Sequence, residues 1–463
     1  MCIRDSIGIR ALAVATIGVG AYAFAVVTRH QWGETARWSS QTFAVVWACV
    51  VLTAAFPFTL GTAFALLALR AVQAGRRWLF AALLVLTVTA SPVAFLLLCV
   101  VLVSVALDRR QGMRLARPAA FVLIVAFLEL LLWRAFPAGG RYPFSLADAA
   151  AACTFCLIGM AVTWRVEPAR LLRHLFMMYL VACVAIFLIP TSVGENIARL
   201  RFVAIPLAVL TLSLRAWRPR PLALLVLALA VSWNVSPLAW SMANSSADPA
   251  SEGDYWRPAI TFLKAHLTPS YRVEAVDTVD HWPAAHLARA GIPLARGWFR
   301  QDDFPENEVL YGQLGGREYL RWLRGLGVRY VVASDAPADY SARGELRLIQ
   351  TGRSRLRRVF RSRHVAVYVV PAPSPIVVGS GRARVVALKS STLVLVLDRP
   401  GAYRVALHYS PYWHASAGCV ARLHDGMMRL DVPRAGLIEL RFAVDAERAL
   451  HAVAGAAGPT CAH

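Results

Sequence analysis

The sequence predicts a polytopic α-helical membrane domain, followed by an extracytoplasmic α/β module and a C-terminal β-sandwich. Hydrophobic residues make up 58% of the chain and charged residues only 16%, whereas an average soluble protein carries about 25% charged residues. The hydrophobic residues form long blocks up to about residue 239, and beyond that point they alternate with polar residues. Long blocks are typical of membrane-spanning helices, and alternation is typical of soluble domains.

The membrane half divides into apolar segments separated by short, Arg-rich loops. A spanning helix needs about 20 residues, and the segments between residues 42 and 107 are shorter than that. They form two pairs, joined at Pro57 and at Pro92. Each pair is either one long kinked helix or a hairpin that turns inside the bilayer. The segments expected to be helical are 7–27, 42–56, 57–70, 78–91, 92–107, 118–134, 145–164, 171–189, 200–215 and 221–239.

The distribution of arginine predicts how this domain is oriented. Four loops together contain 13 Arg, and two others contain only 4. Cytoplasmic loops carry the excess of basic residues, so the first set is expected inside and residues 240–463 outside. Residues 78–107 must then begin and end on the cytoplasmic side, which favours a hairpin around Ser91–Pro92. For residues 42–70 the sequence does not decide, so the sidedness of the first helix stays open. The Arg-rich loops are 70–77, 109–117, 165–174 and 215–220, and the others are 134–141 and 190–201.

The domain boundaries follow from changes in composition. Residues 1–239 form the transmembrane domain, and the polar residues 240–254 form a linker. Residues 255–372 read as an α/β module, because "REYLRWLRGLG" has the spacing of an amphipathic helix and "VRYVVAS" that of a buried strand. Residues 373–463 contain short strands separated by turn residues, a spacing typical of a sandwich.

The basic net charge of +22 points to lipid rather than to nucleic acid. Most arginines of the membrane half lie at the ends of apolar segments, where they set orientation and contact anionic headgroups. We therefore expect membrane lipid as a partner and no nucleic acid. The first six residues, "MCIRDS", resemble a translated sequencing adapter, so we expect the natural protein to begin further upstream and this chain to be a fragment.

Charged residues inside the membrane half are the first candidates for chemistry. Arg199 and Arg201 lie two residues apart in "IPTSVGENIARLRF", and the planar guanidinium suits phosphate; the alternative is that they anchor in lipid headgroups. Glu195 lies beside them as a possible base or an ordinary loop residue. Asp148 is expected at the start of a helix, where it could also serve as a cap. Glu129 lies within an apolar run and needs a functional or structural partner.

The densest polar and aromatic cluster of the soluble half is "RGWFRQDDFPEN". Trp298 could stack on a sugar while Gln301, Asp302 and Asp303 bind hydroxyl groups; the alternative is packing of an exposed loop. No metal-ligand cluster and no cofactor motif is recognisable in the sequence. The "CTFC" spacing of Cys153 to Cys156 falls inside an apolar helix, which favours packing over zinc or thiol chemistry.

Two cysteines of the soluble half are expected to pair. Cys419 and Cys461 are the only cysteines after residue 240. An extracytoplasmic compartment is oxidising and permits a disulfide between them.

Several segments resemble known membrane proteins. "LHYSPYWHASAGCVARLHDGMMRLDVPRAGLIELRF" resembles the terminal β-module of YfhO-like bacterial membrane proteins, and "YLRWLRGLGVRYVVAS" resembles their α/β module. "SPVAFLLL" and "VGENIARLRF" are similar to segments of the GT-C glycosyltransferase superfamily. The resemblance implies transfer of a sugar from a polyprenyl-phosphate carrier outside the cytoplasmic membrane, with the lipid-linked donor as a substrate and no cofactor.

The resemblance also implies a catalytic carboxylate on the first outward loop. Residues 1–40 offer only Asp5 and Glu34, and neither lies in a recognisable motif. Either the catalytic loop lies upstream of this chain, or the protein is not an enzyme. The sequence therefore leaves three functions open: a GT-C-like glycosyltransferase, a non-catalytic membrane protein that binds envelope glycans or supports the envelope, and a transporter of a lipid-linked precursor that uses the segments around Pro57 and Pro92 as broken helices.

Overall fold

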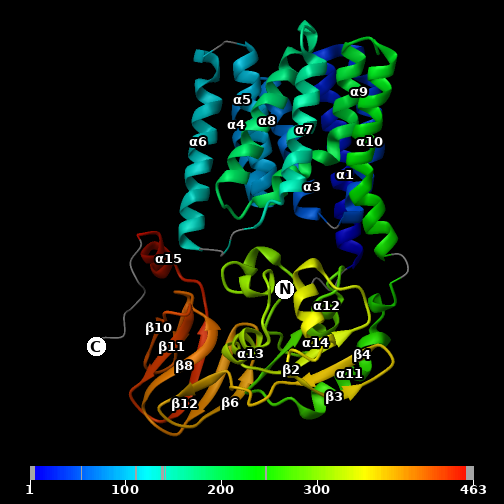
Figure 1. Cartoon of the computed structure of the whole chain (residues 1–463). Coiled ribbons are helices and arrows are strands. Elements are labelled where there is room, and N and C mark those ends of the chain that lie inside the picture. The colour runs from blue at the N-terminus through cyan, green and yellow to red at the C-terminus, as the bar shows by residue number, and fades with distance from the viewer. Residues whose placement is uncertain are drawn as a thin grey trace. The chain divides into compact units, whose positions relative to one another are not determined.

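The computed structural model describes residues 6–53, 55–109, 112–136, 140, 142–245 and 248–454. The chain forms two compact units (Figure 1). The first comprises Met1–Leu130 and Gly140–Ala243, and the second comprises Leu131–Gly139 and Asn244–His463. The predicted fold class is confirmed: a helical, apolar N-terminal region is followed by a mixed α/β sheet and two antiparallel sheets.

The first unit is a bundle of apolar helices (Figure 1). Within its described residues, five helical segments are long and apolar enough to cross a membrane, and three further apolar helices are shorter. The chain is therefore a multi-pass membrane protein. The helices are α1 (Ser6–Trp32), α2 (Arg37–Cys49), α3 (Phe56–Gln73), α4 (Arg77–Ala90), α5 (Pro92–Arg109), α6 (Gly112–Ala135), α7 (Leu146–Thr163), α8 (Arg170–Leu188), α9 (Ala204–Leu214) and α10 (Arg220–Ser245), with the 3-10 segment η4 (Gly194–Val203) before α9.

Contacts between loops show which helix ends lie together. At the end of α1, Trp32 Nε1 donates to Pro168 O at 3.0 Å. Near the end of α5, Asp108 pairs with Arg170 at 2.8 Å. The end of α3 joins the same group, because Gln73 Nε2 donates to the carbonyl of Val27 on α1 at 3.1 Å. The turns after α1, α3 and α7 and the end of α5 therefore lie at one end of the bundle, which we call the Arg-rich end.

This arrangement decides between kinked helices and hairpins. Helix α4 begins and α5 finishes at the Arg-rich end, so the chain turns back at Ser91, where the backbone is extended (φ −161°, ψ 109°). Helices α2 and α3 form a second hairpin, because α2 begins and α3 ends at the Arg-rich end. The sequence had left this point open. Gly61 is needed at this crossing because a Cβ there would lie 2.8 Å from Ser91 Cβ and 2.9 Å from Ala94 Cβ.

The turns of the two hairpins and η4 meet in one apolar core. That core is at the opposite end of the bundle from the Arg-rich loops, and we call it the far end. Backbone interrupted at membrane depth is tolerated only where protein surrounds it, and here the surrounding protein is aromatic: Trp47 stacks on Phe43, and Phe58 lies 6.4 Å from Phe202. The buried residues of this core are Phe24, Phe43, Trp47, Val50, Phe58, Ala94, Phe202 and Leu238.

The second unit begins with the α/β module. Its sheet has the strand order β1-β2-β4-β3, with β1 and β2 parallel and the other neighbours antiparallel. Helix α13 packs on it through Tyr319, Leu320 and Leu323, spaced as an amphipathic helix requires. The elements are α11 (Gly253–His266), β1 (Arg272–Ala275), α12 (Trp282–Arg289), α13 (Gly316–Gly325), β2 (Val328–Ser334), α14 (Arg343–Gln350), β3 (Arg357–Arg361) and β4 (Val365–Val369).

The C-terminal part consists of two four-stranded antiparallel sheets, ordered β10-β11-β8-β5 and β6-β7-β12-β9. Buried residues of both sheets form one core, as in a sandwich. Along β7 every second side chain is buried, which is the alternation that the sequence showed. The elements are β5 (Val377–Gly379), β6 (Ala383–Leu388), β7 (Thr392–Leu397), β8 (Gly401–His408), β9 (Trp413–Ala415), β10 (Cys419–Arg422), β11 (Met427–Val432), β12 (Gly436–Phe442) and α15 (Ala446–Val453).

Candidate functional site

The 3-10 segment η4 carries the arginines singled out from the sequence. Gly194 begins it with φ +45°, and a Cβ at this position would lie 2.1 Å from the carbonyl oxygen of Tyr142. Two backbone hydrogen bonds hold the loop before α7 against η4: Tyr142 N donates to Thr191 O at 2.9 Å, and Glu195 N donates to Pro143 O at 3.3 Å. Inside the bundle, Tyr179 Oη donates to Ile197 O at 2.9 Å. These contacts fix η4 at the far end of the bundle.

The two guanidinium groups of η4 lie among aromatic rings. Arg199 stacks over the ring of Phe58 at 5.4 Å, and Arg201 stacks over Phe202 at 5.6 Å. Neither guanidinium forms an ion pair within 4.0 Å with a carboxylate of the described residues. Arg201 Nε is buried and has no hydrogen-bond partner there. A buried donor without an acceptor is unfavourable, so this pair is short of an anion.

The three candidate acids differ in how they relate to this pair. Glu195 accepts a long hydrogen bond from Tyr142 Oη at 3.5 Å. Asp148 is exposed and lies in the first turn of α7, where its backbone N–H donates to Ser145 Oγ at 3.1 Å and its carboxylate accepts from the same hydroxyl; Ser145 is thus the N-cap, and Asp148 supports it. Glu129 lies on α6 and is only partly buried, and it forms no ion pair with a described residue. The structure therefore brings Glu195 to the arginines and not Glu129.

An apolar cavity lies between helices of the membrane bundle. Its volume is about 330 Å³, and side chains of α7, α8, α9 and α10 line it, among them Phe155, Phe176, Val226 and Trp233. The next residue on α10, Asn234, donates from Nδ2 to the carbonyl of Arg201 at 2.6 Å. Helix α10 thus contacts both the cavity, through Trp233, and the backbone of η4, through Asn234. An apolar cavity suits the apolar part of a ligand.

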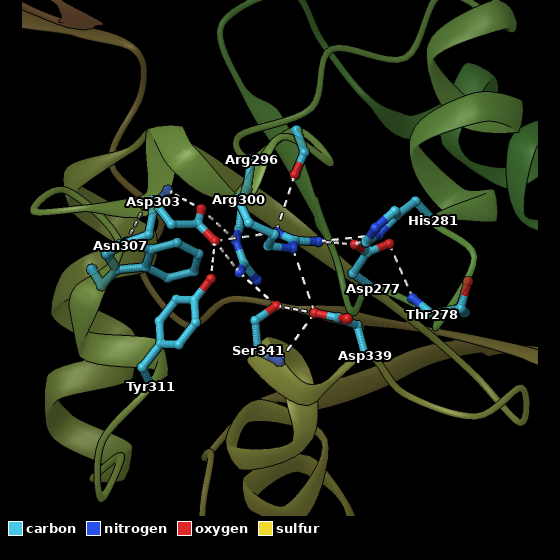
Figure 2. Close-up of polar contacts among 12 residues, drawn as sticks. Asp277, Thr278, His281, Arg296, Arg300, Asp303, Asn307, Tyr311, Asp339 and Ser341 are labelled. Carbon is cyan, nitrogen blue, oxygen red and sulfur yellow. Dashed lines mark hydrogen bonds and ion pairs between the residues drawn. The ribbon is translucent and has the colours of Figure 1, made fainter. Parts of the chain in front are cut away.

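The α/β module contains a second polar cluster. Asp277 follows β1, Asp339 follows β2, and the loop after α12 supplies Arg296, Arg300 and Asp303. Figure 2 shows Arg300 between the carboxylates of Asp277 and Asp303. Ends of neighbouring parallel strands are a common place for ligands in α/β sheets, although only β1 and β2 are parallel here.

Ion pairs hold this cluster together. Arg296 makes a two-point contact with Asp303, at 2.9 Å from Nε and 2.5 Å from Nη2. Burial opposes ionisation of Asp303, but hydrogen bonds from Arg296 and Tyr311 outweigh it and hold the pKa of this carboxyl below its usual value. Asn307 Nδ2 also donates to Asp303, at 2.9 Å. Asp303 therefore has its acceptor sites occupied inside the module.

Two further carboxyl groups lie behind the ion pairs. Glu274 and Glu345 are fully buried, and Tyr319 Oη donates to Glu345 Oε1 at 2.5 Å. Both oxygens of Glu274 and Oε2 of Glu345 have no hydrogen-bond partner in the described structure. Burial raises the pKa of both groups, and the charge of Glu345 raises that of Glu274 further. Five buried carboxyls thus share two buried arginines, so the Glu pair is stable only when it carries protons.

No protein-family model and no curated protein matches this chain. The apolar helices show a multi-pass membrane protein, and no family is assigned to it.

The other residues predicted from the sequence lie as follows. Trp298 is 57% exposed, and Asp302 is exposed as well, so both are free to meet a ligand, whereas the side chain of Gln301 lies outside the described structure. Cys419 is disulfide-bonded, but Cys461 lies outside the described residues, and their pairing stays a prediction. Within the described chain no group of three or more His, Cys, Asp or Glu could hold a metal ion.

Sequence reasoning missed Asp277, His281, Glu274 and Glu345. One signal was available, because an acid follows each of the two strand patterns within five residues: Asp277 in "VEAVD" and Asp339 in "VVASDAPAD". Acids at the ends of adjacent parallel strands lie close together. No comparable signal marks Glu345, which reaches the cluster only because α14 packs on the sheet.

Proposed function

We propose that the membrane domain binds the phosphate group of a lipid-linked carrier at η4. The observation that carries the proposal is the pair Arg199 and Arg201, which lies at the far end of the bundle, forms no ion pair within 4.0 Å with a described carboxylate and leaves Arg201 Nε without a hydrogen-bond partner. Arginine offers a planar set of donors that matches phosphate oxygens. Orphaned donors of this kind are satisfied when such an anion binds.

The apolar cavity supports a lipid rather than a soluble phosphate. Trp233 lines it, and the next residue on α10, Asn234, contacts the Arg201 backbone. A lipid-linked phosphate would place its head at the arginines and the first part of its chain among apolar side chains. A soluble phosphate would gain nothing from the cavity.

The orientation belongs to the same proposal. The Arg-rich end faces the cytoplasm, because basic residues are retained on that side. The far end, η4 and the chain that follows α10 then face outward. A polyprenyl-phosphate sugar presented at the outer leaflet is the carrier that the GT-C resemblance implies, and sugar transfer from it is the corresponding activity. Glu195, beside the arginines, would orient them or accept a proton from the acceptor hydroxyl.

The test is binding of a polyprenyl-phosphate analogue to the full-length chain in nanodiscs. A charge-assisted hydrogen bond contributes about 1.5–3 kcal/mol, so Arg201→Ala should weaken binding roughly tenfold to a hundredfold. Arg201→Lys keeps the charge but removes the planar set of guanidinium donors, so this variant should also bind more weakly. The matched control is Arg173→Lys, since Arg173 also stacks on an aromatic ring, that of Trp164 at 5.9 Å, but at the Arg-rich end.

The outcomes separate the alternatives. Equal binding by the parent and by both Arg201 variants would show that these arginines are lipid anchors. Binding of inorganic phosphate with the same affinity as the lipid would remove the role of the cavity. Filling the cavity by Ala230→Phe should weaken the lipid and leave inorganic phosphate unaffected, because Ala230 lines the cavity wall.

A further inference from the structure

In the α/β module, His281 contacts the buried ion network through Asp277. His281 Nδ1 lies 2.5 Å from Asp277 Oδ2. The backbone of His281 is left-handed, with φ +59° and ψ 29°. This conformation is uncommon outside glycine, although histidine is among the residues that adopt it more often. The imidazole is held in a defined place at the start of α12.

The neighbours of His281 fix which ring nitrogen carries the proton. The Asp277 carboxylate can only accept and lies much closer to Nδ1 than Arg300 Nη2, which lies 3.4 Å away and donates to Asp277. We therefore assign a hydrogen to Nδ1, which donates it to Asp277. Burial lowers the pKa of His281, and the ring is neutral near pH 7. The lone pair is therefore on Nε2, which has no hydrogen-bond partner among the described residues.

An exposed aromatic ring stands beside this acceptor. The rings of Trp298 and His281 have centroids 6.1 Å apart and planes inclined by 38°. Trp298 is 57% exposed, and Phe299 supports it edge-on at 5.7 Å. The His281 side chain is 29% exposed. The site thus offers an apolar ring face and a hydrogen-bond acceptor within reach of one small ligand.

Charge around the site selects against anions. The carboxylates that act on His281 are Asp277, Asp280, Asp339 and Asp303, and the cations are Arg296 and Arg300. Both arginines are already paired with carboxylates. Four carboxylates against two arginines leave the site negatively charged, so an anionic lipid headgroup would be repelled and would find no unpaired arginine among these groups. A neutral ligand with hydroxyl groups would meet an acceptor for its O–H and a ring for its C–H face.

We propose that Trp298 and His281 form a binding site for a neutral carbohydrate on the soluble unit. The sugar ring stacks on Trp298, and one of its hydroxyl groups donates to His281 Nε2. Asp277 acts as a positioning residue that holds the histidine in the required tautomer. This site lies in a different unit from η4 and does not depend on the lipid-phosphate proposal.

The test is saturation-transfer NMR on the full-length chain in nanodiscs. The probes are four neutral oligosaccharides: cellotetraose, mannotetraose, maltotetraose and chitotetraose. The parent should bind at least one of them. Trp298→Ala should reduce affinity at least about tenfold, whereas Trp298→Phe keeps an aromatic face and should bind within about threefold of the parent. His281→Phe keeps a ring without the acceptor, and losing one neutral hydrogen bond should weaken binding about three- to tenfold.

His266→Phe is the matched control, because His266 also lies on a helix of this module, is exposed and stacks on Phe262 at 4.3 Å. It should bind as the parent does. A parent that binds none of the four probes would overturn the proposal. So would equal binding by the parent, Trp298→Ala and His281→Phe. Binding of phosphatidylglycerol vesicles through Trp298, in place of sugar, would overturn it in favour of a membrane anchor.

Discussion

The buried Glu274–Glu345 pair predicts how the stability of the soluble unit depends on pH. Both carboxyls have a raised pKa in the folded protein, with burial as the main cause. The folded state therefore binds more protons than the unfolded state above the ordinary glutamate pKa. Stability from these groups is complete at low pH and is lost as the pH rises from that value towards the folded pKa.

Of the two glutamates, Glu345 is the better one to replace, by Glu345→Gln. The amide oxygen can still accept from Tyr319, which donates to Glu345 Oε1 at 2.5 Å, and glutamine cannot ionise. One proton per carboxyl corresponds to a slope of about 1.4 kcal/mol per pH unit. Between pH 5 and pH 7 the variant should therefore gain up to roughly 2.7 kcal/mol of stability relative to the parent.

The assay is pulse proteolysis in urea, applied to the full-length chain in nanodiscs at several pH values. Cleavage between β1 and β4 reports unfolding of the α/β module. Glu318→Gln is the control, because Glu318 lies in the first turn of α13 and is exposed; it removes the same charge without changing the buried pair. If the parent and Glu345→Gln lose stability with the same slope, the pair does not hold protons in the folded state and the reasoning is wrong.

Topology, disulfide pairing and the backbone at Gly194 can each be tested separately. Single cysteines at Asp254 and Glu167, both exposed, should label oppositely with an impermeant maleimide in whole cells: Asp254→Cys from outside, Glu167→Cys only after lysis. Peptide mapping without reductant should find Cys419 joined to Cys461, and a different partner would contradict the pairing. Gly194→Ala should displace η4, because its Cβ would meet a carbonyl oxygen at 2.1 Å with φ at +45°; we expect binding of the polyprenyl-phosphate analogue to fall at least about tenfold, and unchanged binding would exclude η4 as the site.

The candidate sites were only partly predictable from the sequence. Arg199 and Arg201 stood out because charge is rare in an apolar half, and the structure places both beside aromatic rings. Trp298 stood out because it lies in the densest polar and aromatic cluster of the soluble half. His281 did not, because a single histidine in a polar loop carries no pattern. Its importance arises from Asp277 four residues before it and Arg300 nineteen residues after it.

The sequence by itself determined the class of the protein and most of its elements. Apolar length defines membrane helices, because unpaired backbone is excluded from lipid, and alternation defines the strands. The Arg-rich loops also predicted the hairpin at Ser91, because charge at helix ends reports which ends lie together. These are local properties that each segment carries with it.

Only the tertiary structure decided which distant residues meet. The hairpin of α2 and α3 became visible through Gln73 and Val27, which are 46 residues apart. The ion network joins Asp277 on one strand end to Asp339 on another through Arg300, although 62 positions separate the two acids. No local pattern encodes such contacts, because they form only when helices and sheet bury their apolar faces together. Burial also removes the water that would otherwise solvate Glu274 and Glu345, so the chemistry of these residues is a property of the folded state alone.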